Sequence, residues 1–166
     1  MEYQKRKRPR LKQYDYSLPG YYYVTIHTEK NTPHLSNVQT GGAFHRASVH
    51  LTELGKIAQQ QLLLLEKRYA HVKMDKYVIM PTHIHAIIRL TEGTAGASPR
   101  PTVPDVIGAY KSLTTRACNQ AFCTPGRKLF QTSFYDMVLR NETAYQECWR
   151  YIDENPEKWL LNPEDI

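Results

Sequence analysis

The sequence predicts an α+β protein in which an antiparallel sheet carries helices packed mainly on one face. Short runs of β-branched and tyrosine residues alternate with a period of two, as strands do. Three longer segments carry apolar residues at intervals of three or four, as amphipathic helices do. With 166 residues and 41% apolar side chains, the chain is about the size of one domain that buries its own core.

The first half of the chain predicts two strands, a helix and two more strands. The four expected strands are residues 21–28, residues 44–50 and the two apolar runs on either side of Pro81 within residues 77–90. The polar segment 31–42 contains proline and glycine and is expected to form a turn. Thr52 is expected to cap a helix over residues 53–69.

The second half predicts a helix, a strand and a final helix. Residues 91–104 carry glycine and proline without periodicity and are expected to form a loop. A helix is expected from Asp105, a strand at 134–140, and a third helix capped by Asn141. The inward residues expected on the two helices are Val106, Ile107, Tyr110, Leu113 and Ala117, then Tyr145, Cys148, Trp149 and Ile152. This order is similar to a ferredoxin-like or RRM-like sandwich, which hosts many activities.

The charge of the chain favours a polyanionic partner. The formal net charge is +6 and the isoelectric point is about 9.2. Basic residues gather in an N-terminal arm, residues 1–16, which precedes a single domain at residues 17–166. The arm's candidates for phosphate contacts are Arg6, Lys7, Arg8, Arg10 and Lys12. A solvated tail with no partner is the alternative.

The remaining composition favours a cytoplasmic protein with no membrane partner. No apolar run approaches the roughly 20 residues of a membrane span, and the N-terminus is too basic for a secretory signal. The three cysteines, Cys118, Cys123 and Cys148, lack the spacing of a zinc site and are expected to be reduced.

Two histidines lie one residue apart on the strand that follows Pro81. The period of two sends Ile84, Ala86, Ile88 and Leu90 to one face, and His83, His85, Ile87 and Arg89 to the other. A strand holds neighbouring imidazoles at a fixed spacing, which suits a divalent cation. The alternative is a pair of half-buried polar residues, because His-x-His is short and common.

A tyrosine on the expected third helix is a candidate nucleophile. Tyr151 and Asn155 are four residues apart, so they lie within one helical turn at the edge of the packing face. Alternatively, Tyr151 is an ordinary boundary residue and Asn155 ends the helix, since Pro156 disfavours helical geometry in the residue before it. Tyr110 is a competing nucleophile, but its helical spacing places it in the core.

Four segments, in order, resemble the single-tyrosine HUH transposases, and in particular the short branch related to REP-associated tyrosine transposases. They are His83-Ile84-His85, then Tyr110-Lys111-Ser112 with Arg116, then Phe130-Gln131 through Phe134-Tyr135 to Arg140-Asn141-Glu142, and finally Tyr151-Ile152-x-x-Asn155-Pro156. The resemblance runs from about Leu11 to Pro163, which is nearly the whole chain.

This resemblance implies a DNA strand transferase that cleaves and rejoins single-stranded DNA near hairpins through a 5′-phosphotyrosine. His83 and His85 match the HUH histidines, and Tyr151 matches the nucleophile. Asn155 stands where the family places a third polar metal ligand, often glutamine; asparagine is shorter, and Pro156 follows it. The implied cofactor is Mg²⁺ or Mn²⁺, the implied partner is a single-stranded DNA hairpin, and the implied assembly is a monomer or homodimer.

Further DNA contacts are expected from the folded domain. The candidates for backbone contacts are Lys111, Arg116, Arg127 and Lys128, and exposed tyrosines such as Tyr14 or Tyr16 are candidates for base stacking. Two other functions stay open at this point. One is a catalytically inactive single-stranded nucleic-acid-binding module that stacks bases on residues 21–23, and the other is a structural zinc or copper protein.

Overall fold

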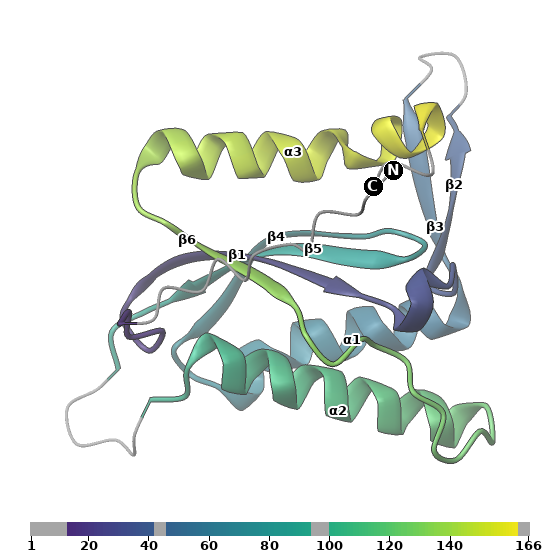
Figure 1. The fold of residues 1–166 in the computed structure, drawn as a ribbon, viewed down its shortest axis with the longest axis horizontal. Coiled ribbons are helices and arrows are strands. Elements are labelled where there is room, and N and C mark those ends of the chain that lie inside the picture. Colours follow the sequence, from purple (N-terminus) through teal and green to yellow (C-terminus); the bar gives the residue numbers. More distant parts are fainter. Residues whose placement is uncertain (1–12, 42–45, 94–99, 163–166) are drawn as a thin grey trace.

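The computed structural model describes residues 13–41, 46–93 and 100–162, and its main sheet has four antiparallel strands in the order β4-β5-β1-β6. The strands are β1 Gly20–His27, β4 Val72–Ile79, β5 His83–Leu90 and β6 Tyr135–Leu139. Helices α1 (Glu53–Arg68) and α2 (Val103–Ala121) cover one face, and α3 (Glu142–Leu161) lies across the other (Figure 1). The α+β class, with most helices on one face of an antiparallel sheet, is confirmed.

Side-chain alternation along β5 supplies both faces of the sheet. Ile84, Ala86 and Ile88 belong to the larger core cluster beneath α1 and α2. Ile87 faces the other way and joins Tyr23 and residues of α3 in a smaller cluster. Each such aliphatic side chain contributes about 1.5–3 kcal/mol when fully buried. The same alternation carries the two histidines to the α3 face, as the sequence predicted.

The hairpin β2 (Ser36–Thr40) and β3 (Ala47–Leu51) forms a separate two-stranded sheet beside the end of α3 (Figure 1). The sequence prediction was therefore wrong for residues 36–40, which form a strand rather than a turn. It was also wrong about the third expected strand, because β4 begins at Val72 and not at residue 77. Most residues of β2 are polar and exposed, so no buried alternation marks the strand.

Helix α1 confirms the predicted helix over residues 53–69, with Thr52 as its cap. The Thr52 side chain accepts from the backbone of Gly55, as an N-cap does. Gly55 itself is required by packing, because a Cβ atom there would collide with the carbonyl oxygen of Leu35.

The other two helices differ in detail from the prediction. Helix α2 begins at Val103, two residues early, because Thr102 and Asp105 form a capping box. Its buried positions include Thr114 and Cys118 in place of the expected Leu113 and Ala117. Helix α3 continues through Pro156 to Leu161, so Asn155 does not end it.

Candidate active site

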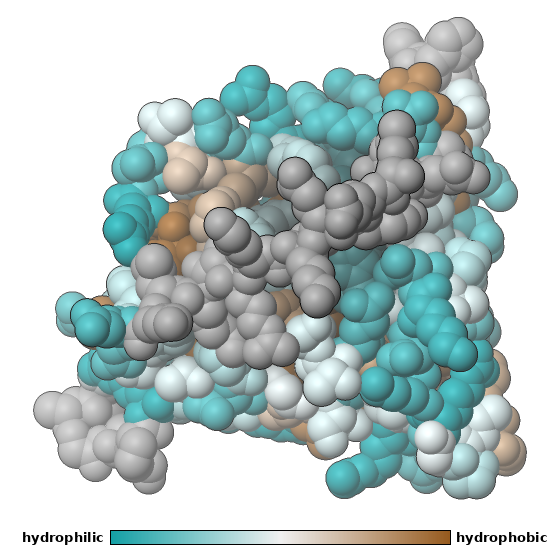
Figure 2. All heavy atoms as spheres, viewed as in Figure 1, coloured by the Kyte–Doolittle hydropathy of each residue, from teal (hydrophilic) through white to brown (hydrophobic). Residues whose placement is uncertain are grey.

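A hollow of about 240 Å³ opens on the α3 side of the main sheet. Strands β1, β5 and β6 and helix α3 all contribute to its wall. The lining residues are Tyr23, Thr25, His27, His83, His85, Tyr135 and Tyr151. The viewed side of the molecule is mostly hydrophilic, and hydrophobic side chains show at the upper left, where α3 meets the sheet (Figure 2).

The two histidines of β5 lie against each other at the base of this hollow. Their ring centroids are 4.5 Å apart and the rings are inclined at 64°. His83 is fully buried and His85 is 4% exposed. Paired with β1, His85 stands opposite Thr25, and His83 stands opposite His27. Pairing in the sheet therefore places a third imidazole, that of His27, 5.5 Å from the ring of His83.

The Nδ1 atom of His85 meets two hydroxyl groups. The Tyr23 hydroxyl lies 2.7 Å away and the Thr25 hydroxyl 2.9 Å away. The Nε2 atom is buried and has no hydrogen-bond partner among the described residues. Burial, and then the neighbouring His83 and His27, hold the pKa of His85 well below its usual value, so His85 is neutral at physiological pH.

His83 is held from both of its ring nitrogens. The Thr82 hydroxyl lies 3.0 Å from Nδ1, and the side-chain oxygen of Asn155 lies 3.3 Å from Nε2. Asn155 is fully buried, and its Nδ2 atom has no partner among the described residues. Helix α3 thus brings Asn155 to the histidine pair, as the resemblance implied.

Tyr151 reaches the same hollow one helical turn before Asn155. Its ring centroid is 5.3 Å from that of His85 and 6.4 Å from that of Tyr23. The side chain is 37% exposed, so its position at the edge of the packed face combines contact with accessibility. The Lys158 ammonium lies 4.8 Å from the centroid of the Tyr151 ring.

The donor atoms at this site suit a divalent cation. Within residues 13–41, 46–93 and 100–162, no three His, Cys, Asp or Glu side chains lie close enough to hold a metal ion by themselves. Two imidazoles and the Asn155 amide form a mixed nitrogen and oxygen set. The buried, partnerless Nε2 of His85 is the group that such an ion would satisfy. The residues therefore fit the implied metal.

Comparison with known proteins identifies solved structures with a similar fold. No family model matches the chain. An uncharacterized protein of Haemophilus influenzae is 26% identical over 175 residues, which cover 93% of this chain and 89% of that protein. The structure of a REP-associated tyrosine transposase bound to a REP hairpin superimposes with a TM-score of 0.63 and 18% identity, over 90% of this chain and 73% of that one. The chain has the fold of this transposase.

A second solved structure agrees. A transposase candidate from Deinococcus radiodurans R1 superimposes with a TM-score of 0.52 and 18% identity, over 92% of this chain and 98% of that one. The fold that the resemblance to transposases implied is thus confirmed.

Two of the basic residues expected to contact DNA, Lys111 and Lys128, lie near the end of β1. Lys111 donates to the Thr132 carbonyl at 2.7 Å, and Lys128 donates to the Thr132 hydroxyl at 3.1 Å. Burial, and then the charge of Lys128, lower the pKa of Lys111. Lys128 also pairs with Glu29 at 3.1 Å. Neighbouring Gln131 donates its backbone N–H to the carbonyl of His27, which places this cationic pair beside the histidine end of the sheet.

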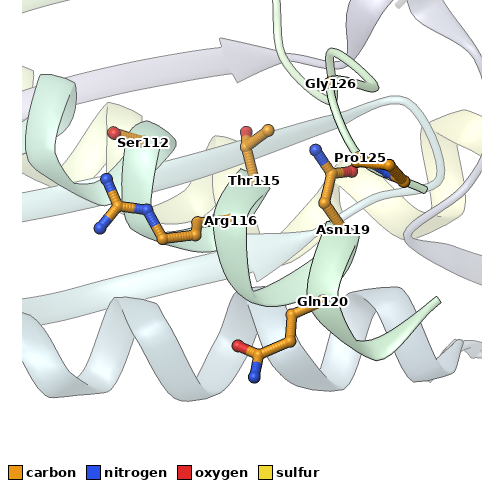
Figure 3. A pocket seen from close by; sticks show the side chains of 7 residues that line it. All are labelled: Ser112, Thr115, Arg116, Asn119, Gln120, Pro125 and Gly126. Atoms are coloured by element: carbon orange, nitrogen blue, oxygen red, sulfur yellow. The ribbon is translucent and has the colours of Figure 1, made fainter. Parts of the chain in front are cut away.

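The other expected contacts are placed differently. Arg127 donates to Nε2 of His34 at 3.1 Å. Arg116 lines a second hollow of about 450 Å³ beside α2 (Figure 3). Its other lining residues are Ser112, Thr115, Asn119, Gln120, Pro125 and Gly126. Helix α2 covers the face of the sheet opposite α3 (Figure 1). The five basic candidates of the N-terminal arm, Arg6 to Lys12, lie outside the described residues.

The structure tests the expected places of two tyrosines, Tyr16 and Tyr110. Tyr16 is 7% exposed and packs beside Tyr14 and Tyr22 in the larger core, so its expected role as an exposed stacking residue is wrong. Tyr110 is fully buried and donates to the Ala58 carbonyl, which confirms its place in the core. Tyr23 and Thr25 were not expected beside the histidines, although both alternate onto one face of the expected first strand.

Two further observations concern the cysteines and the helices. Cys118, Cys123 and Cys148 are all free thiols, as expected. In the described part of the chain, no helix is both long and apolar enough to span a bilayer.

Proposed function

We propose that this protein is a metal-dependent DNA transposase or endonuclease that cleaves and rejoins single-stranded DNA through a 5′-phosphotyrosine intermediate. The observation that carries the proposal is the position of Tyr151. Its accessible phenol shares one hollow with His83 and His85, and Asn155 from the same helix reaches His83. One phosphodiester is small enough to meet the phenol and the histidine pair together.

In the proposed reaction, the phenolic oxygen of Tyr151 attacks the scissile phosphorus in line. The new P–O bond to tyrosine forms as the bond to the 3′ oxygen breaks, the phenolic proton passes to solvent, and the 3′ oxygen takes up a proton. Rejoining reverses these steps, with a 3′-hydroxyl displacing the tyrosine. Because one phosphate ester replaces another, the reaction needs no nucleotide cofactor.

His83, His85 and Asn155 are the proposed ligands of Mg²⁺ or Mn²⁺. Such an ion polarises a phosphate and offsets charge that develops on its oxygens. The protein's own contribution at His85 is to keep a ring-nitrogen lone pair available. The lowered pKa of His85 supports this role, since a protonated imidazole cannot be a ligand. Burial of Asn155 keeps its oxygen at the histidine pair rather than in solvent.

The proposed substrate is a single-stranded DNA hairpin. The solved transposase of the same fold is bound to a REP hairpin, which supports this class of DNA. The ammonium groups of Lys111 and Lys128 converge on Thr132 near the histidine end of the sheet, where backbone phosphates would relieve their mutual repulsion.

The alternative of an inactive module that stacks bases on residues 21–23 is not favoured by the structure. Tyr22 is fully buried and Tyr23 is 7% exposed, so neither ring offers a face to a base.

Covalent trapping tests the proposed function. A labelled single-stranded hairpin is incubated with the protein and Mn²⁺ and run on a denaturing gel. Wild type is expected to form an adduct that Tyr151→Phe loses, whereas Tyr77→Phe, whose hydroxyl meets Gln59 of α1 outside the hollow, keeps it. An adduct that persists in Tyr151→Phe, or the absence of any adduct despite intact hairpin binding, contradicts the proposal.

A further inference from the structure

His85 is buried, and the hydrogen-bond partners of its two ring nitrogens decide which nitrogen carries the hydrogen. A neutral imidazole has one N–H and one lone pair, and the partner of each nitrogen decides where the hydrogen lies. For His85, two hydroxyl oxygens lie within hydrogen-bonding distance of Nδ1, from Tyr23 at 2.7 Å and Thr25 at 2.9 Å. No described residue bonds to Nε2.

These contacts favour hydrogen on Nδ1. An N–H at Nε2 would be a buried donor without an acceptor in the described part of the chain, which is a costly arrangement. An N–H at Nδ1 has two acceptors. Strand pairing fixes both of them, because Thr25 stands directly opposite His85 in the β1–β5 register and Tyr23 is its diagonal neighbour.

His83 provides an internal contrast on the same strand. Its Nε2 atom faces the side-chain oxygen of Asn155 at 3.3 Å, which accepts a hydrogen bond. Its Nδ1 atom faces the Thr82 hydroxyl at 3.0 Å, which donates one. In the metal-free protein, the two neighbouring histidines are therefore expected to be opposite tautomers, with hydrogen on Nε2 of His83 and on Nδ1 of His85.

We propose that Tyr23 and Thr25 are positioning residues that hold His85 in its Nδ1–H tautomer, so that the Nε2 lone pair is available to the divalent cation. This inference rests on the proposed function for the cation, but the tautomer itself does not. Tyr23 also packs against Tyr151, with 6.4 Å between the two ring centroids. One tyrosine of β1 thus touches both the candidate ligand and the candidate nucleophile.

The first test reads the tautomers without metal or DNA. Two-dimensional ¹H–¹⁵N correlation spectra of the histidine rings assign the protonated nitrogen of each imidazole. Wild type is expected to show Nδ1–H for His85 and Nε2–H for His83. The double variant Tyr23→Phe with Thr25→Val removes both acceptors and is expected to shift His85 toward Nε2–H, while His83 is unchanged. Wild-type His85 with hydrogen on Nε2, or an unaltered His85 in the double variant, overturns the assignment.

The second test measures Mn²⁺ binding by calorimetry in the absence of DNA. Loss of such supporting contacts lowers metal affinity by about 10–100-fold in other sites, and the double variant is expected to fall in that range. Tyr135→Phe is the matched control, because it removes another hydroxyl that lines the hollow. Among the described residues, this hydroxyl has its hydrogen-bond contact with the Met137 sulfur, at 3.8 Å. Thr25→Ser keeps the hydroxyl and is expected to bind as wild type does.

If the double variant does not fold, the single variants Tyr23→Phe and Thr25→Val are measured instead. Each is expected to lose less Mn²⁺ affinity than the double variant. Equal Mn²⁺ affinity in wild type and in the folded acceptor variants overturns the positioning role. The absence of Mn²⁺ binding by wild type overturns the metal role. Neither result depends on strand cleavage, so the trapping experiment tests the proposed function separately.

Discussion

At the scale of single residues, Asn155 is the most informative position. A fully buried amide is expensive unless its polar atoms are used, and here only the oxygen has a protein partner, at 3.3 Å from His83. The Nδ2 atom has none among the described residues. Asparagine is one methylene shorter than the glutamine that the sequence resemblance would place here. The packing of α3 on the sheet nevertheless brings the Asn155 oxygen within 3.3 Å of His83.

Replacing Asn155 tests its role as a ligand. Asn155→Ala removes the oxygen and is expected to weaken Mn²⁺ binding by at least about tenfold, because a third of the proposed ligand set is lost. Asn155→Asp retains an oxygen and is expected to bind at least as well as wild type. Calorimetric titration measures both. Asn162→Ala, at the exposed C-cap of the same helix, is the control. Wild-type affinity in Asn155→Ala would remove Asn155 from the ligand set.

At the scale of elements, the attachment of α3 to the sheet decides where Tyr151 lies. The apolar contact is a small cluster around Ile87 and Ile152. Polar contacts to β4 supplement it, since Tyr145 donates to Asp75 at 2.6 Å and Lys76 pairs with Asp153 at 2.9 Å. Because these attachments are modest, substitutions that remove one of them are expected to affect the position of α3.

The hydrogen bond between Tyr145 and Asp75 gives α3 a pH-dependent attachment. Because the Asp75 carboxylate accepts this hydrogen bond, the pKa of Tyr145 is raised to about 12. Burial is the second cause. Because the pKa of Tyr145 is higher in the folded state, the hydrogen bond stabilises the fold fully below the unfolded-state pKa of about 10. This stabilisation disappears as pH rises toward 12. Tyr145→Phe is expected to cost roughly 0.5–1.5 kcal/mol of unfolding free energy at pH 8.

Urea denaturation of wild type and Tyr145→Phe at a series of pH values measures this dependence. The difference in unfolding free energy between the two proteins is expected to be constant up to about pH 9 and to shrink between about pH 10 and 12. A difference that does not change over this range would show that the hydroxyl contributes nothing through Asp75.

At the scale of the whole molecule, the net charge of +6 predicts that hairpin binding weakens with salt. Each phosphate neutralised on single-stranded DNA contributes about 0.7 to the slope of log affinity against log salt concentration. Lys111→Ala and Lys128→Ala are each expected to reduce the slope by roughly that amount, measured by fluorescence anisotropy. Lys56→Ala, which removes a charge paired with Glu53 on α1, is expected to leave it unchanged. Equal slopes in all variants would exclude both lysines as phosphate contacts.

Much of the fold could be predicted because local and long-range signals agree. Alternation along 83–90 gave the two faces of β5, and the caps at Thr52 and Asn141 marked two helices where they begin. The site residues His83, His85, Tyr151 and Asn155 were selected by their motifs, and the structure brings all four together.

What could not be predicted depends on contacts between distant segments. Hairpin β2–β3 has a mostly polar and exposed strand, and it packs beside α3, a segment distant in sequence. Tyr23 and Thr25 contact His85 across 62 and 60 residues of sequence, through a strand register that no single segment reveals. Thr114 and Cys118 are buried because of how α2 is rotated on the sheet, which polarity alone did not indicate.

The two-sided burial of β5 has a consequence for how this chain can change over time. Substitutions along the strand affect one face at a time, and replacements of similar size are tolerated best. One residue inserted within β5, between His83 and Ile84, would instead reverse every strand side chain after it, sending His85 toward the aliphatic interior and the isoleucines that face it toward the hollow. Length variation in this lineage should therefore collect in the connections and leave β5 at a constant number of residues.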